Sequence, residues 1–288
     1  MTTVPANADG VPLGRRMLNK VPEVTIFFWL IKIMCTTVGE TGADYVNDNL
    51  GFGLSKTTYV SAALLAVLLL IQFRLRRYVP VAYWAVVVVI SVFGTLITDN
   101  LTDGHNVPLT TTTPIFAVIL AVVFAVWYFF ERTLSIHSIV TTRREGFYWL
   151  AILFTFALGT AAGDLVAEKF DLGYGVSIAI FAGIIALITF AHYALRLNAV
   201  LAFWLAYIMT RPLGASIGDF MSQNSKKYGG LNLGTTGTSY IFLGCIFLLV
   251  IYLSISRRDQ TPPDLIVKEL GEVPPGAAAS VPAPSAAG

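Results

Sequence analysis

The chain has 288 residues, of which 56% are hydrophobic and only 12% are charged. Soluble domains carry roughly 25% charged residues, so this chain has too few charges to cover a water-exposed surface, and lipid must surround much of it. Its net charge of +2 gives no reason to expect a nucleic-acid partner. Cys35 and Cys245 have no partner at metal or disulfide spacing, and we expect no cofactor.

Along the chain, two polar ends flank a series of apolar segments. Residues 1–20 and the Pro/Ala/Gly-rich residues 257–288 are predicted to be disordered. A helix needs ~20 apolar residues to cross ~30 Å of hydrocarbon, and eight segments meet this condition. They span roughly 22–45, 57–73, 80–101, 114–130, 147–167, 175–195, 198–221 and 238–255. The sequence therefore predicts an all-α integral membrane protein with about eight transmembrane helices.

The basic residues outside these segments fall mostly on one side of the predicted membrane. That side carries Arg15, Arg16, Lys20, Arg74, Arg76, Arg77, Arg132, Arg143, Arg144, Arg196, Arg257, Arg258 and Lys268. The other side carries Lys56, Lys169, Lys226 and Lys227. Because basic loops stay in the cytoplasm, we expect both termini to be cytoplasmic and the protein to lie in a bacterial inner membrane.

One pattern recurs four times with identical spacing: an aromatic residue, Trp, nine residues, Gly, four residues, Asp. The four copies are Trp29, Gly39 and Asp44; Trp84, Gly94 and Asp99; Trp149, Gly159 and Asp164; and Trp204, Gly214 and Asp219. Such regularity indicates an internal repeat, with predicted units at 21–78, 79–133, 145–197 and 198–256. Each unit holds two helices, so all four copies share one orientation and are pseudo-symmetric about the membrane normal.

This arrangement resembles a family of bacterial membrane proteins built from four tandem two-helix repeats, each with a characteristic tryptophan. The resemblance covers about residues 20–256 and rests on the four Trp/Gly/Asp copies. The family is of unknown function, so the resemblance implies the architecture and no substrate.

Each repeated residue has a physical interpretation. The tryptophans near the helix starts are typical of an interfacial belt, and the glycines are typical of close helix–helix approach. The Asp lies 15 residues after the Trp, or ~22 Å along a helix, so all four carboxylates share one depth. They should face protein or water. Together they could bind a divalent cation or relay protons.

A structural interpretation of the aspartates stays open beside this one. The even-numbered helices begin on the same side, and their positive N-terminal ends could satisfy the carboxylates. Hydroxyl groups are available there at Thr110 to Thr113 and at Thr235, Thr236 and Thr238. In this case each Asp would staple together the two helices of its own repeat.

Three further charges break the symmetry of the repeat. Lys32, Glu40 and Arg211 occupy slots that are uncharged in the other copies. Intramembrane charges mark functional sites by default, so we predict that Glu40 joins the ion or proton site and that Lys32 and Arg211 tune its charge. Glu40 and Arg211 lie about one turn apart in depth and could form an ion pair.

The sequence contains no nucleotide-binding, metalloprotease or serine-hydrolase motif, and we expect no enzymatic activity. The favoured hypothesis is a small secondary transporter or channel for a cation, either a divalent metal or one coupled to protons. Its expected partners are membrane lipid and that cation or proton. The alternative is a non-transporting scaffold or regulatory protein with structural aspartates. An intramembrane enzyme acting on lipid is a third option, but it lacks a nucleophile–base pair.

Overall fold

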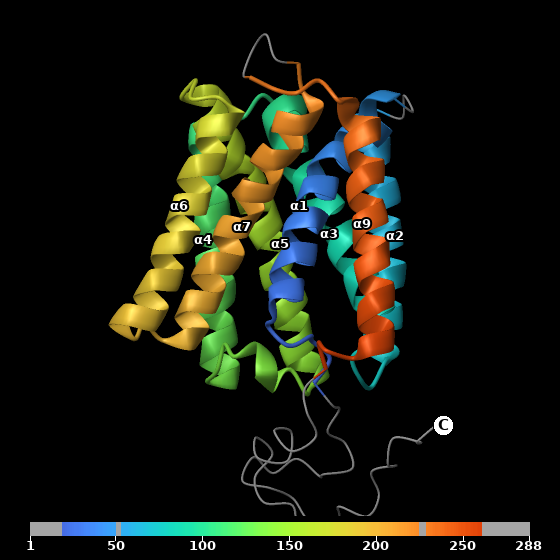
Figure 1. Ribbon diagram of the computed structural model, residues 1–288, viewed down its shortest axis with the longest axis vertical. Coiled ribbons are helices and arrows are strands. Elements are labelled where there is room, and N and C mark those ends of the chain that lie inside the picture. Colours follow the sequence, from blue (N-terminus) through green and yellow to red (C-terminus); the bar gives the residue numbers. More distant parts are fainter. Residues whose placement is uncertain (1–18, 50–52, 225–228, 261–288) are drawn as a thin grey trace, which may run out of the picture.

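The computed structural model describes residues 19–49, 53–224 and 229–260, and all regular structure in these ranges is helical. Eight long helices run side by side (Figure 1). They are α1 (Ile26–Asp44), α2 (Leu54–Arg74), α3 (Pro80–Asp99), α4 (Leu109–Glu131), α5 (Thr142–Asp164), α6 (Tyr174–Leu195), α7 (Ala199–Ser222) and α9 (Gly234–Ser256). All eight are long and apolar enough to cross a membrane. The predicted all-α protein with eight transmembrane helices is confirmed.

The helices form an inner ring and an outer layer. The inner helices α1, α3, α5 and α7 are 56–67% buried, whereas the outer helices α2, α4, α6 and α9 are 11–28% buried. Around the ring, α1 packs against α3, α3 against α5, α5 against α7, and α7 against α1. Each inner helix begins at the end where its Trp lies, here called the tryptophan end. It finishes at the aspartate end, which is the upper end in Figure 1.

Each outer helix packs mainly on the inner helix of the following repeat. Helix α2 lies on α3, α4 on α5, and α6 on α7, while α9 from the last repeat returns to lie on α1. The two helices of one repeat are therefore neighbours in sequence but not the main packing partners. This order ties every repeat to the next and closes the circle between the fourth and the first.

Short helical turns extend three of the inner helices beyond their Asp. After Asp44, Asp99 and Asp164 the chain continues for five residues as a wider π-helical turn: η2 (Tyr45–Asn49), η3 (Asn100–Gly104) and η5 (Leu165–Lys169). Such turns are rare and are frequent at functional sites. Another short element, the 3₁₀ turn η4 (Ile136–Ser138), lies in the segment between α4 and α5 at the tryptophan end.

Both chain ends are ordered for a few residues where disorder was predicted. Lys20 is buried, forms an ion pair with Glu145 (2.7 Å), and donates to the main-chain oxygens of Gln72 and Phe73. These carbonyls belong to the last turn of α2, where helices leave acceptors unsatisfied. The prediction of disorder is thus wrong for residues 19 and 20. Residues 1–18 lie outside the described part of the chain.

The C-terminal side is anchored in the same region. Asp259 is buried and accepts a hydrogen bond from the Tyr78 hydroxyl (2.5 Å), while its main-chain oxygen accepts from the Glu23 amide (2.8 Å). Burial raises the pKa of Asp259 and also that of Tyr78. The prediction of disorder is therefore wrong for residues 257–260, and residues 261–288 lie outside the described ranges.

Candidate functional site

The candidate site lies along the axis of the inner ring. In α1, residues 28, 32, 36, 40 and 44 are four apart, so each side chain stands about one turn above the previous one. The repeat places the matching positions of α3, α5 and α7 beside them, which gives five layers of four residues. From the tryptophan end, layer one is Phe28, Tyr83, Tyr148 and Phe203; layer two is Lys32, Val87, Ile152 and Tyr207; layer three is Thr36, Ser91, Phe156 and Arg211; layer four is Glu40, Thr95, Thr160 and Ala215; layer five is Asp44, Asp99, Asp164 and Asp219.

The repeat glycines make room for layer three. A side-chain carbon built on each glycine would overlap the layer-three residue of the next helix around the ring. The pairs are Gly39 with Ser91, Gly94 with Phe156, Gly159 with Arg211, and Gly214 with Thr36. Each inner helix therefore inserts one side chain against the bare backbone of its neighbour, and this contact repeats around the whole ring.

Arg211 lies at the centre of the bundle and is fully buried. Its Nη1 donates to the main-chain oxygen of Thr36 (2.9 Å), and its Nη2 contacts Glu40 Oε2 (3.2 Å), Thr160 Oγ1 (2.7 Å) and Thr95 Oγ1. One guanidinium on α7 is thus bound to the other three inner helices. The ion pair that the sequence suggested between Glu40 and Arg211 is present.

Three carboxylates meet just above Arg211, here called the acid cluster. Oxygens of Glu40, Asp164 and Asp219 all lie within 4.8 Å of one another. They come from three different repeats and from layers four and five. Asp44 and Asp99 lie outside this group of three but are near enough for their charges to interact with it.

The four repeat aspartates differ in their exposure. Asp219 is only 7% exposed, whereas Asp44, Asp99 and Asp164 are half-buried. Near this end, the Thr113 hydroxyl at the start of α4 donates to the main-chain oxygen of Ala161 in α5, and the Tyr174 hydroxyl at the start of α6 donates to Glu168. The staple interpretation of the aspartates stays open beside the ion site.

The repeat tryptophans lie inside the protein rather than on a lipid-facing belt. Trp84, Trp149 and Trp204 are buried, and Trp29 is half-buried. Their indoles pack against the aromatic rings of layer one, as for Trp149 against Tyr83 (5.4 Å between ring centroids). The belt interpretation is corrected for the three buried residues: adjacent aromatic rings hold them between helices.

The tyrosines of layer one add a polar contact that the sequence did not predict. Tyr83 and Tyr148 are fully buried, and their hydroxyls lie 2.5 Å apart. Layers two and three fill the axis with buried side chains. The polar residues of layer four, Thr95 and Thr160, were missed as well, and the four-residue spacing from the aromatic residue before each Trp is the signal that could have revealed them.

The repeat pattern is also recognised by comparison with known proteins. A family model described as "Repeat of Unknown Function (DUF347)" matches residues 27–78, 82–133, 147–198 and 202–259. The chain belongs to this family. The resemblance inferred from the four Trp/Gly/Asp copies is therefore confirmed, and the repeat family's description assigns no activity to its members. No curated protein and no solved structure gives a significant match.

Proposed function

We propose that this protein is a secondary transporter for a cation in the bacterial inner membrane, with the acid cluster as its binding site. In this proposal both termini are cytoplasmic and the aspartate end faces outward, as the distribution of Lys and Arg favours.

The observation that carries the proposal is the meeting of three carboxylates on the axis. Oxygens bound to one Ca²⁺ or Mg²⁺ ion at roughly 2.0–2.6 Å lie at most about 5 Å apart, and those of Glu40, Asp164 and Asp219 meet this limit. Asp164 and Asp219 also lie near the C-terminal ends of their helices, where the helix dipole disfavours negative charge. Oxygen ligands alone are typical of hard cations such as Mg²⁺, Ca²⁺ and Mn²⁺.

Glu40 belongs to two arrangements at once. It contributes an oxygen to the acid cluster and is also the ion-pair partner of Arg211. A bound cation would therefore compete with the Arg211 guanidinium for the same carboxylate. Because Arg211 is hydrogen-bonded to α1, α3 and α5, this competition would act on the packing of the whole inner ring, as alternating access requires.

A transporter fits the axis better than an open channel. All residues of layers two and three are buried, and they include bulky side chains such as Phe156 and Tyr207. An ion at the acid cluster would find these two layers between itself and the tryptophan end. Passage would need a rearrangement of the inner helices rather than diffusion through a preformed pore.

Ion flux into proteoliposomes tests this function, with Mn²⁺ as the probe ion. We expect Asp164→Asn and Asp219→Asn each to reduce Mn²⁺ uptake at least about tenfold, since losing a charged ligand costs 1.4 kcal/mol or more. Asp103→Asn is the matched control, because Asp103 is exposed and outside the cluster. Mn²⁺ should also raise the Tm of the wild type. If both cluster variants keep wild-type uptake, the binding site is wrongly assigned.

A panel of cations separates this function from the scaffold alternative. A wild type that carries none of Mg²⁺, Ca²⁺, Mn²⁺ or monovalent cations, although correctly folded, would favour the non-transporting role. In that case the Asp164→Asn and Asp219→Asn variants should differ from the wild type in stability only.

A further inference from the structure

Lys32 is a second buried cation on the axis, two layers closer to the tryptophan end than Glu40. It is fully buried. Its Nζ donates to the main-chain oxygen of Tyr207 (2.8 Å) and contacts Thr210 Oγ1. It also lies 4.3 Å from the ring centroid of Tyr207 and 5.5 Å from that of Phe156.

In the described part of the chain, no carboxylate lies within ion-pair distance of the Lys32 ammonium. A buried charge without an anionic partner is costly, and packing gives no reason for it, because Val87 and Ile152 fill the same layer in repeats two and three. A lysine amine, unlike a guanidinium, can release its proton inside a protein. Lys32 is thus the charged group of layer two, and its ammonium can exchange a proton.

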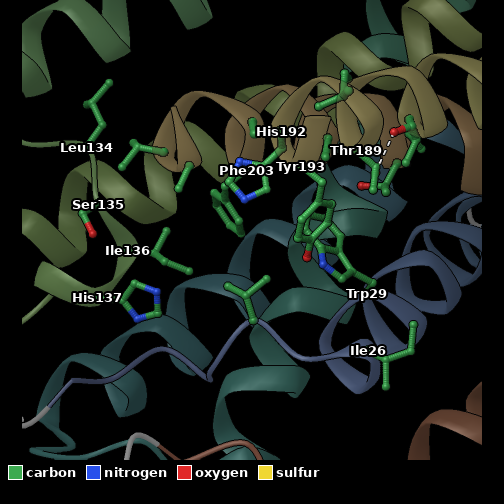
Figure 2. Close-up of a pocket in the computed structure, with 18 of the residues that line it drawn as sticks. Ile26, Trp29, Leu134, Ser135, Ile136, His137, Thr189, His192, Tyr193 and Phe203 are labelled. Atoms are coloured by element: carbon green, nitrogen blue, oxygen red, sulfur yellow. Dashed lines mark hydrogen bonds between the residues drawn. The ribbon is translucent and has the colours of Figure 1, made fainter. Parts of the chain in front are cut away.

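A pocket leads toward Lys32 from the tryptophan end. It has a volume of about 480 Å³ and lies between α1, α6, α7 and the segment before α5 (Figure 2). Most of its lining is apolar, but the polar side chains of Ser135, His137, Thr189 and His192 also line it. Tyr193, another lining residue, is 80% exposed. The pocket can hold several waters at ~30 Å³ each, and imidazoles such as those of His137 and His192 are common proton shuttles.

Thr210 joins this pocket to Lys32. It is among the lining residues, it is buried, and its hydroxyl contacts Lys32 Nζ. On the opposite side, Lys32 is followed along the axis by Arg211, which holds Glu40 of the acid cluster. Lys32 therefore lies between a route from the tryptophan end and the binding site near the aspartate end.

We infer that Lys32 binds the proton that is exchanged for the transported cation, and that this proton reaches it through the pocket of Figure 2 and Thr210. The inference rests on the proposed transport function and adds its coupling. In one cycle the ammonium releases its proton to water on one side and the neutral amine regains a proton from the other side, so Lys32 returns to its starting state.

The ionisable groups around Lys32 come from several helices. Arg211 and Tyr207 are contributed by α7, and Cys35 lies on α1 itself. Tyr83 of α3 lies near Cys35, and Tyr148 of α5 bonds to Tyr83. Helix α9 packs on the outside of α1, and its ionisable side chains are exposed: Tyr240, Cys245 and Tyr252.

The test is Mn²⁺ accumulation in proteoliposomes with an acidic interior and the membrane potential clamped to zero. For each proton exchanged, a gradient of one pH unit should accumulate Mn²⁺ about tenfold in the wild type. Lys32→Met and Lys32→Arg should both abolish accumulation, the second because an arginine keeps the charge but holds its proton. Ile152→Met, in the same layer, is the control and should accumulate Mn²⁺ as the wild type does. Accumulation by Lys32→Arg would overturn the inference.

Thr210→Val tests the route, and the repeat supplies a matched control. Thr155 is the same position in repeat three, is equally buried, and donates to its own helix in the same way, but it does not line the pocket. Thr210→Val should reach the tenfold Mn²⁺ ratio several times more slowly than the wild type. Thr155→Val should reach it at the wild-type rate. Equal rates in the two variants would overturn the assigned route.

Proton release on Mn²⁺ binding provides a readout that needs no flux. Calorimetry in two buffers of different ionisation enthalpy should show about one proton fewer released by Lys32→Arg than by the wild type, since one coupling group is lost. Equal proton release by the wild type and Lys32→Arg would overturn the inference. This measurement can also be made on a variant whose Mn²⁺ transport is too slow to assay. If Mn²⁺ flux in the wild type does not respond to the pH gradient, the coupling to protons is overturned and the transport function stands. The absence of any flux overturns the transport function and this inference with it.

Discussion

The inner helices α1 and α7 differ from the outer helices in a way that is opposite to the trend in a soluble protein. Helices α1 and α7 are the most buried of the eight spans and also the least apolar. In water the most buried helix is the most apolar, because burial of apolar surface drives folding. Lipid tails are as apolar as the outer helices, so the outer layer needs no polar face. The inner ring is where polar and charged side chains can find partners.

The largest expected effect comes from breaking the central ion pair of the inner ring. Arg211→Met should lower the free energy of unfolding by about 3–5 kcal/mol, since Glu40 would be left as a buried charge without its partner. The double variant Arg211→Met/Glu40→Gln should be more stable than Arg211→Met alone. Unfolding in detergent measures the free energy of unfolding of the single and the double variant. Additive losses in this double-mutant cycle would show that the two side chains act independently.

A smaller effect on stability is expected from glycine-to-alanine changes, which should differ between the closely packed inner ring and the loosely packed outer layer. Gly159→Ala would push a methyl group into Arg211, which should cost about 1–3 kcal/mol. Gly183→Ala on the outer helix α6 meets no atom within 4 Å and should be neutral or stabilise the helix by up to about 1 kcal/mol. The Tm values of the two variants decide this prediction, and an equal decrease for both would refute it.

The smallest expected effect lies outside the ring, at the contact between Tyr78 and Asp259. Burial raises the folded-state pKa of Asp259, so the folded protein binds this proton more tightly than the unfolded chain does. The stability from protonation is present at low pH and is lost as the pH rises through the raised pKa. The Tm of the wild type should therefore rise relative to the Tm of Asp259→Asn as the pH falls from 7 to 4. A constant difference would show that Asp259 does not contribute to the pH dependence.

The spans and the repeat could be predicted because both depend on local sequence. The length of an apolar run decides whether a helix can cross lipid, and identical Trp/Gly/Asp spacing needs no structure to be seen. The pairing of Glu40 with Arg211 followed from comparing matching slots. The position of Trp84 inside the protein could not be predicted in this way, because a tryptophan near a helix start suits both an interface and an aromatic core.

Two features of the site depend on the packing of helices that are distant in sequence. The sequence presents Asp44, Asp99, Asp164 and Asp219 as equivalent, yet Glu40 joins only Asp164 and Asp219 within 4.8 Å. Helix tilt and side-chain rotamers decide this selection, and neither follows from spacing. The pocket that reaches Thr210 is likewise assembled from α1, α6, α7 and the segment before α5, which no single stretch of sequence reveals.

The return of α9 to α1 has a consequence for how the protein is made. Of the eight described spans, α1 leaves the ribosome before the others and α9 after them. At about 5–20 residues per second, α1 must wait on the order of ten seconds or more in the membrane before its outer partner has been synthesised. During that time Lys32 and Glu40, which both lie on α1, have neither Tyr207 nor Arg211 beside them. Helix α1 is thus inserted long before its charges are shielded, so the nascent chain has an interval in which insertion factors or water must stabilise it.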